Sequence, residues 1–253
     1  MSSDQERTSA LRASLVGICA GILSGLFGVG GGFIMVPLYV LWLGVGQKKA
    51  HATSLAAIIP IATTAAAGYA FNHEVDWNAV VLVMLGSVVG ANYGVRLLGA
   101  LELRTIRIGF CILLLVTTVR LLWSAQPHQV FTGLLGHVML VVIGLFAGVM
   151  AGLFGVGGGI VIVPALMLTS GVDATVARGT SLAVIVGSAI SGTIAHHRRR
   201  NPDHRLATIS GLAGVPAALA SSYVGSSVHS NVLVWLFCII LLYTAWRMSR
   251  TES

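Results

Sequence analysis

A glycine-rich segment that occurs twice in the chain has the composition of an anion-binding loop. The two copies, Leu26 to Gly32 and Leu153 to Gly159, each end in three consecutive glycines inside an apolar run. Three glycines interrupt a helix, and non-helical backbone at membrane depth is tolerated only where protein or a wet cavity satisfies it. The freed amides and a new helix N-terminus would then attract an anion, whereas the alternative is a structural kink without a ligand. The candidate amides belong to Gly30, Gly31, Gly32, Gly157, Gly158 and Gly159.

A second paired motif supplies hydroxyl and basic side chains downstream of each glycine segment. Its members are His51, Thr53 and Ser54 in the first copy and Arg178, Thr180 and Ser181 in the second. Hydroxyls and basic groups that converge on the glycine segments would hydrogen-bond a tetrahedral oxyanion, and His51 can titrate near neutral pH. Thr and Ser at the start of a helix can instead cap that helix. The sequence leaves both interpretations open.

Other polar side chains inside the apolar segments are few. Asn92 and Tyr93 are weaker substrate-binding candidates, because a buried amide can simply bond to a neighbouring helix. The eight acidic residues all fall in a terminus or beside a short polar break, so we expect no carboxylate within a span. Cation transport through a carboxylate site is therefore disfavoured. If transport is coupled to protons, the proton must travel on the substrate, on His51 or through water and hydroxyls.

The elements that position these motifs belong to a membrane protein. Of the 253 residues, 56% are hydrophobic and 9% are charged, and the mean hydropathy is +0.90. Charged residues run near a quarter in soluble domains. The formal net charge of +7 would suggest nucleic acid in a soluble protein, but membrane proteins retain Lys and Arg on the cytoplasmic side. We therefore predict an all-α polytopic membrane protein that lies in the lipid bilayer and does not bind nucleic acid.

The chain contains an internal repeat. Residues 17–38 and 144–165 align at an offset of 127 with 13 of 22 positions identical, and the same offset matches Asp76 to Asp203 without a gap. We predict a single membrane domain, 1–253, that consists of repeat 1 (1–125) and repeat 2 (126–253).

Each repeat is predicted to contain a helix hairpin broken at the glycines and three further transmembrane helices. The second apolar segment of each set is too short to span a bilayer, which takes roughly 20 residues. The predicted segments are 13–29, 33–44, 52–71, 79–98 and 106–123 in repeat 1, and 138–156, 160–171, 179–195, 206–223 and 232–248 in repeat 2.

This count of crossings is odd, so repeat 2 enters the membrane from the opposite face and the repeats are inverted. With both termini cytoplasmic, Lys48, Lys49 and the basic run 196–205 lie inside, whereas Glu74 and Asp76 lie outside. A parallel arrangement would place a basic cluster outside, against the positive-inside rule. The sequence therefore favours inverted repeats.

The glycines also form stripes at every fourth position, such as Gly17, Gly21 and Gly25. Small residues on one helical face let another backbone approach closely. We expect these stripes to pack within the monomer, with a homodimer as the alternative.

The three cysteines, Cys19, Cys111 and Cys238, lie in apolar runs without C-x-x-C spacing. No metal site or disulfide framework is indicated by this pattern. Cys111 and Cys238 are equivalent in the two repeats, which would suit a thiol-based sulfur relay, although packing is the more ordinary role of a lone cysteine among leucines. No pattern in the sequence indicates an enzyme or a cofactor.

The paired G-x-G-G-G-x-x-x-V-P segments, each followed by T-S-L-A, resemble the TauE/SafE sulfite exporter family, also called the toluene sulfonate uptake permease family. The resemblance covers about 12–248. It implies an inner-membrane carrier that exports sulfur-containing anions, such as sulfite or small organosulfonates. The motif match carries over Gly28 to Gly32, Thr53 and Ser54, with Gly155 to Gly159, Thr180 and Ser181. His51 and Arg178 differ between the repeats, so their roles are inferred from chemistry.

We therefore expect a secondary transporter that works by alternating access around an anion site at the membrane midplane. A passive anion channel is the main alternative, and the thiol-based relay is the second.

Overall fold

The computed structural model describes residues 3–100, 133–200 and 202–228, with isolated positions at 102, 108, 112, 115, 233, 236, 239 and 242. These residues form helices and no strand, which confirms the predicted all-α class. The predicted spans 106–123 and 232–248 lie almost entirely outside the described residues. The helices are α1 (Ser3–Phe27), α2 (Gly32–Leu43), α3 (Gln47–Phe71), α4 (Trp77–Ala100), α6 (Gly133–Phe154), α7 (Gly159–Thr169), α8 (Ala174–Arg200) and α9 (His204–Ser227).

Six of the described helices are long and apolar enough to cross a membrane. These helices expose many large hydrophobic side chains, such as Leu11, Val81 and Leu212, which suits contact with lipid. The protein is therefore a multi-pass membrane protein. The spanning segments are Thr8–Phe27, Gln47–Phe71, Trp77–Leu98, Gly133–Phe154, Ala174–His197 and His204–Ser227.

The first two helices form the broken hairpin predicted from the glycines. α1 ends at Phe27, and α2 begins at Gly32 after a loop whose last residue, Gly31, has a φ of 74°. The Arg12 guanidinium near the start of α1 donates a hydrogen bond of 3.1 Å to the carbonyl oxygen of Trp42 at the end of α2. α2 therefore runs back along α1 instead of continuing across the membrane.

The second repeat has the same local geometry. α6 ends at Phe154, and α7 begins at Gly159 after Gly158, whose φ is 89°. Only glycine adopts this left-handed conformation without strain, so a sharp turn immediately before a new helix requires it here. Two short helices, α2 and α7, thus begin at glycine loops inside the bundle.

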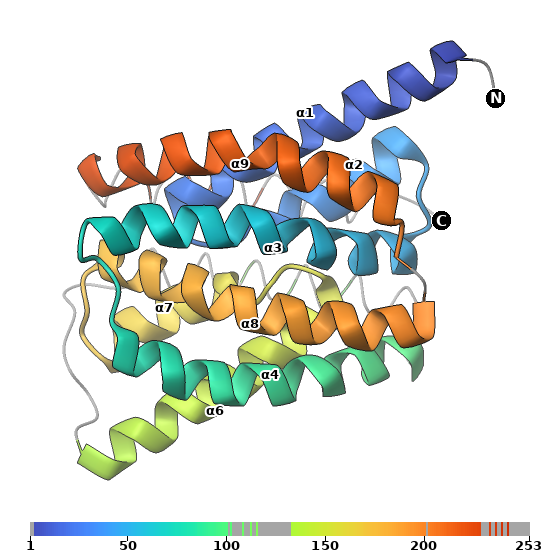
Figure 1. The fold of residues 1–253 in the computed structure, drawn as a ribbon. Coiled ribbons are helices and arrows are strands. Elements are labelled where there is room, and N and C mark those ends of the chain that lie inside the picture. The colour runs from blue at the N-terminus through green and yellow to red at the C-terminus, as the bar shows by residue number, and fades with distance from the viewer. Residues whose placement is uncertain are drawn as a thin grey trace.

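Helices from the two repeats alternate across the molecule. Figure 1 shows α9, α3, α8 and α4 side by side, and the contacts between α9 and α3, α3 and α8, and α8 and α4 agree with that order. α1 packs mainly on α9, and α6 packs mainly on α4. The first helix of each repeat therefore packs on the fourth helix of the other repeat.

The central helices α3 and α8 run antiparallel. The amide of Asp203, just after α8 ends, donates to Thr53 near the start of α3, while the amide of Asp76, just after α3 ends, donates to Thr180 near the start of α8. Figure 1 shows the same opposed directions. The orientation of the repeats across a bilayer stays a prediction, although the basic and acidic loops do lie at opposite ends of these helices.

The glycine stripes pack within the monomer. A Cβ added at Gly17 would collide with the carbonyl of Ser210 in α9, and one at Gly144 would collide with the carbonyl of Val83 in α4. Such contacts place the two backbones directly against each other, which maximises van der Waals contact where lipid supplies no hydrophobic driving force. The expected intramolecular use of these stripes is confirmed for the described helices, and a homodimer stays a prediction.

Candidate functional site

The two glycine loops meet at the centre of the bundle. A Cβ added at Gly159 would lie 2.6 Å from the Cα of Val29 and 2.8 Å from the carbonyl oxygen of Gly28. In the reciprocal contact, a Cβ at Gly32 would collide with the carbonyl oxygen of Gly155. Each short helix therefore begins against the glycine loop of the other repeat. The six candidate glycines from the sequence are brought together in one place.

Two serines fasten these loops. Ser54 of α3 donates a hydrogen bond of 2.8 Å to the carbonyl oxygen of Gly155, and Ser181 of α8 donates one of 2.8 Å to the carbonyl oxygen of Gly28. Each serine thus holds the loop of the opposite repeat. Because a hydroxyl has one hydrogen, these groups donate to an anion only if the loop contacts break.

The two threonines lie at opposite ends of the central helices. Thr53 Oγ1 accepts a hydrogen bond of 3.0 Å from the amide of Asp203 and donates one of 2.9 Å to the carbonyl of Lys49. Thr180 Oγ1 accepts a hydrogen bond of 3.0 Å from the amide of Asp76. We call these two contacts the Thr53–Asp203 clasp and the Thr180–Asp76 clasp. They link the start of a central helix to a loop of the other repeat.

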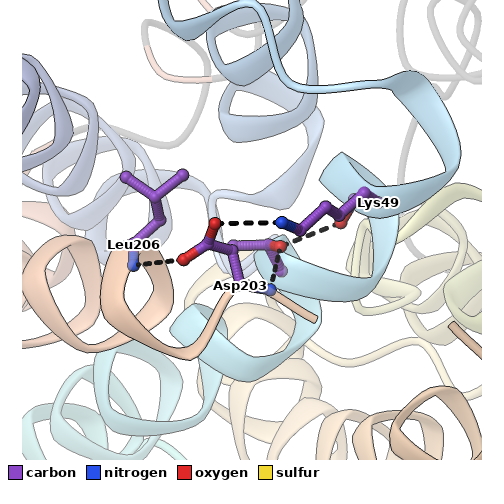
Figure 2. Close-up of polar contacts among 4 residues, drawn as sticks. Lys49, Asp203 and Leu206 are labelled. Carbon is purple, nitrogen blue, oxygen red and sulfur yellow. Dashed lines mark hydrogen bonds and ion pairs between the residues drawn. The ribbon is translucent and has the colours of Figure 1, made fainter. Parts of the chain in front are cut away.

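The Thr53–Asp203 clasp carries an additional ion pair. Figure 2 shows the Lys49 ammonium and the Leu206 amide meeting the carboxylate of Asp203, at 3.1 Å and 3.2 Å. Burial alone raises the pKa of Asp203, but the hydrogen bond from Leu206 and the charge of Lys49 outweigh it, so the pKa lies below the ordinary aspartate value. Asp203 therefore stays ionised and caps the start of α9.

Arg178 is the strongest candidate for contact with an anion. Its side chain is 3% exposed, and the Cα and Cβ pack so closely on Gly28 that a Cβ there would lie 2.5 Å from the Arg178 Cα. Nη1 donates a hydrogen bond of 3.1 Å to the carbonyl of Gly225, whereas Nη2 is buried without a hydrogen-bond partner among the described residues. A buried guanidinium with an unused donor is costly unless something compensates it.

His51 holds the equivalent place in repeat 1. It is 2% exposed, and Nδ1 lies 2.6 Å from the carbonyl oxygen of Phe154. A carbonyl only accepts hydrogen bonds, so Nδ1 carries a proton in this contact. His51 therefore helps to position the second glycine loop.

Asn92 and Tyr93 lie on α4, which carries neither glycine loop. The Asn92 amide donates hydrogen bonds to Val88 and to Ser191, at 3.0 Å and 2.8 Å, so it links α4 to α8. Tyr93 is 58% exposed, and the Arg96 guanidinium lies 5.6 Å from the centre of its ring. Asn92 therefore makes the bond to a neighbouring helix that the sequence analysis gave as the alternative to substrate binding.

Sequence reasoning overlooked a pair of isoleucines at the centre. Ile58 and Ile185 are equivalent at the repeat offset, and both are fully buried. Ile185 lies so close to the loops that a Cβ at Gly30, Gly157 or Gly159 would come within 3.1, 2.9 or 2.8 Å of it. The repeat alignment contained this pair, but apolar side chains are too common in a membrane segment to attract notice.

No group of three or more His, Cys, Asp or Glu side chains that could hold a metal ion occurs in the part of the chain that the structure describes. Cys19 is exposed on α1, whereas Cys111 and Cys238 lie outside the described residues.

The geometry thus defines a polytopic membrane protein with two interlocked helical repeats around paired glycine loops. The family profile described as "Sulfite exporter TauE/SafE" matches residues 2–121 and 140–253, so the chain belongs to the TauE/SafE family. The family resemblance noted in the sequence is confirmed, and the family identifies the protein as a membrane transporter.

Curated relatives carry the same general description. A probable membrane transporter protein of Bacillus subtilis, YunE, is 36% identical over 47% of this chain, and the match spans 46% of that relative's own length. A probable membrane transporter protein of Methanocaldococcus jannaschii is 28% identical over 72% of this chain and 70% of its own. One of Xylella fastidiosa (strain 9a5c) is 26% identical over 92% of each chain.

Proposed function

We propose that this protein is a secondary transporter that exports small sulfur-containing oxyanions, sulfite or short organosulfonates, across the inner membrane by alternating access. The observation that carries the proposal is the buried Arg178 side chain, which packs on Gly28 of the first glycine loop and whose Nη2 has no hydrogen-bond partner among the described residues. A sulfonate or sulfite oxygen would accept from this donor.

The glycine loops add a second attraction for an anion. The first amides of a helix have no partner within that helix, and the helix N-terminus carries a partial positive charge. α2 and α7 begin at the contact between the loops, so both N-termini favour negative charge at the same place. No Asp or Glu lies within either glycine segment, and the acidic group near Arg178 is Glu74 of the loop between α3 and α4.

Alternating access is favoured over an open channel because the centre is packed. Ile58 and Ile185 fill the space between the glycine loops. The Thr53–Asp203 clasp and the Thr180–Asp76 clasp are both formed, at opposite ends of α3 and α8. An anion would cross if one clasp opened at a time while the loops separated from the isoleucines on that side.

We place the end with Lys49 and the basic run 196–205 on the cytoplasmic side, with both chain termini, because retained Lys and Arg mark that side. The Thr53–Asp203 clasp would then face the cytoplasm. The Thr180–Asp76 clasp, with Arg178 and Glu74, would face the outside.

The direct test is transport in proteoliposomes. Purified wild-type protein should move labelled sulfite, or a short sulfonate such as methanesulfonate, faster than protein-free vesicles, and the rate should saturate with anion concentration. A current that follows voltage without saturating would instead identify a channel. Replacement of all three cysteines by serine should leave the transport rate unchanged, since a thiol relay would lose it. Wild-type vesicles that move no anion above the protein-free background would refute the proposed function.

A further inference from the structure

Glu74 brings a carboxylate to the buried arginine. It lies in the loop between α3 and α4, where its amide donates a hydrogen bond of 3.0 Å to the carbonyl oxygen of Tyr69. Gly179, the residue after Arg178, packs on this loop so tightly that a Cβ there would collide with the Glu74 carbonyl and lie 2.8 Å from the Tyr69 Cβ. The start of α8 is therefore pressed against the acidic loop.

The carboxylate of Glu74 is itself incompletely satisfied. Its Oε2 is buried and has no hydrogen-bond partner among the described residues. Among the described residues, the ion pair within 4.0 Å is the one between Lys49 and Asp203. Glu74 and Arg178 do not form such a pair, so they are neighbours without direct contact. A buried cation and a partly buried acid thus lie close together, and each has a polar atom without a hydrogen-bond partner among the described residues.

The charges around Glu74 are few. The charge of Arg178, on α8, acts on it, and the Tyr69 phenol at the end of α3 lies beside both. In its own loop, the neighbouring titratable groups are His73 and Asp76, and the Asp76 carboxylate caps α4 through the amides of residues 78 and 79. Burial raises the pKa of Glu74 above its ordinary value, whereas the charge of Arg178 acts in the opposite direction.

The repeat alignment shows that this charged pair has no charged equivalent. At the offset of 127, Glu74 corresponds to Asn201 and Arg178 corresponds to His51. The two Thr–Asp clasps, by comparison, use equivalent residues at both ends of the molecule. The end of the molecule with the Thr180–Asp76 clasp therefore has an acid and a permanent cation. The equivalent sequence positions at the end with the Thr53–Asp203 clasp are an asparagine and a histidine.

We propose that Glu74 and the transported anion compete for the Arg178 guanidinium, so that the protein takes up a proton at Glu74 when the anion binds. In the unoccupied site, the negative charge opposite Arg178 is the Glu74 carboxylate. In the occupied site, it is the anion, and one proton from solution adds to a Glu74 carboxylate oxygen. The net charge of the site is the same before and after.

This competition rests on the proposed function, because it needs an anion at Arg178. Its consequence is reciprocal linkage. An anion bound at Arg178 removes the stabilisation of ionised Glu74 and so raises the affinity of Glu74 for a proton. Protonation of Glu74 raises the affinity for the anion by the same factor. The proton thus travels with the anion on a residue of the chain. The sequence alone had offered only the substrate, His51, or water and hydroxyls for this task.

The test measures protons taken up per anion bound. Calorimetric titration with methanesulfonate, a permanent monoanion in water, is run in two buffers of different ionisation enthalpy at a pH just above the Glu74 pKa. Wild-type protein should take up a fraction of a proton per bound anion, and this fraction should rise toward one as the pH is raised from the anion-free pKa of Glu74 to midway between it and the anion-bound pKa. The Glu74→Gln variant should bind the anion with no linked proton, and its affinity should lose its dependence on pH. Asp173→Asn, which removes an exposed acid at the same end of the molecule, should behave as wild type.

A second readout needs no anion. Infrared spectroscopy follows the C=O band of protonated carboxyl groups as the pH is changed, and the band missing in Glu74→Gln identifies Glu74. In Arg178→Gln the midpoint of that band should move to higher pH, because a positive charge that favours the carboxylate has been removed.

The outcomes separate the two ideas. Anion binding with unchanged proton uptake in Glu74→Gln overturns the role of Glu74 and leaves the proposed function standing. An unchanged infrared midpoint in Arg178→Gln overturns the pairing of the two residues. If wild type neither binds nor moves sulfite or methanesulfonate, the proposed function is wrong and the competition falls with it.

Discussion

Ser181 of the second repeat donates a hydrogen bond of 2.8 Å to the carbonyl oxygen of Gly28 in the first repeat. Its equivalent, Ser54, donates one of the same length to Gly155. These two bonds join the halves of the molecule at the glycine loops. The repeats are therefore interlocked, and neither glycine loop is held by its own half alone.

We expect Ser181→Ala to destabilise the protein by about 1–3 kcal/mol, because the variant leaves the buried carbonyl of Gly28 without a donor. The measurement is unfolding in detergent, followed by circular dichroism. Ser54→Ala should lose a similar amount, by the symmetry of the two contacts. Ser227→Ala serves as the control, because Ser227 is exposed and its hydroxyl donates to the carbonyl of Tyr223 in its own helix. A Ser181→Ala variant as stable as this control would contradict the role assigned to the bond.

Gly159→Ala should be far more damaging than Gly46→Ala. A methyl group at Gly159 would lie within 2.8 Å of two atoms of the first glycine loop and of one atom of Ile185. A methyl group at Gly46 would meet no atom within 4 Å. Overpacking of a tight contact costs about 1–3 kcal/mol or more. The two variants are compared by the yield of monodisperse protein and by thermal unfolding. Equal stability would show that the two loops do not touch as the structure has them.

Asp203 should make the stability of the protein sensitive to acid. Because its native pKa lies below the ordinary value, its contribution is present above an unfolded pKa of about 3.9 and is lost as the pH falls through the lower native pKa. The ion pair with Lys49 is largely exposed, so the contribution is small, about 0.2–1 kcal/mol. Unfolding of wild type and Asp203→Asn should differ near neutral pH and converge in strong acid. A constant difference at every pH would exclude this carboxylate as the cause.

Much of the helical framework could be predicted from the sequence. The predicted segment 33–44 corresponds to α2 (Gly32–Leu43), because an apolar run between glycines has clear limits. The predicted segment 52–71 missed the first turn of α3, which starts at Gln47. That turn is mostly polar. A prediction from apolar runs ends where polar residues begin, even when the helix continues beyond the apolar core of the membrane.

The partners of the site residues could not be predicted. Ser54 and Gly155 are 101 residues apart, and no local propensity tells a hydroxyl which carbonyl will accept from it. The hydroxyls were candidates for contact with an anion or for helix capping, and in the structure Ser54 and Ser181 donate to the glycine loops. Glu74 was set aside because it lies in a loop. The packing of Gly179 against that loop brings its carboxylate near a buried arginine, which only the tertiary structure shows.

Arg178→Ala should weaken the binding of sulfite or methanesulfonate by at least about tenfold, since a hydrogen bond to a charged group contributes about 1.5–3 kcal/mol. Lys48→Ala is the comparison, because Lys48 is expected only to anchor the orientation in the membrane. Arg178→Lys should recover part of the affinity, since it keeps the charge and loses the planar pair of donors. Affinity is measured by calorimetry, with unfolding curves to show that the variants are folded. Equal affinities for Arg178→Ala and Lys48→Ala would remove Arg178 from the site.

The paired isoleucines provide the sharpest test of carrier against channel. Ile58 and Ile185 fill the contact between the glycine loops, so truncation of both should leave a gap that water and small ions can enter. We expect the double variant Ile58→Ala with Ile185→Ala to leak anions passively in proteoliposomes. The leak is measured as a current that does not saturate as the anion concentration rises, and wild type should show no such current. Ile108→Ala with Ile112→Ala is the control, because these isoleucines are exposed. Each central Ile→Ala change also costs about 2–5 kcal/mol of stability, so the leak is interpreted only for protein that elutes as a single folded species. If wild type already conducts, and the double variant conducts equally, the isoleucines do not seal the pathway and the channel is the better description.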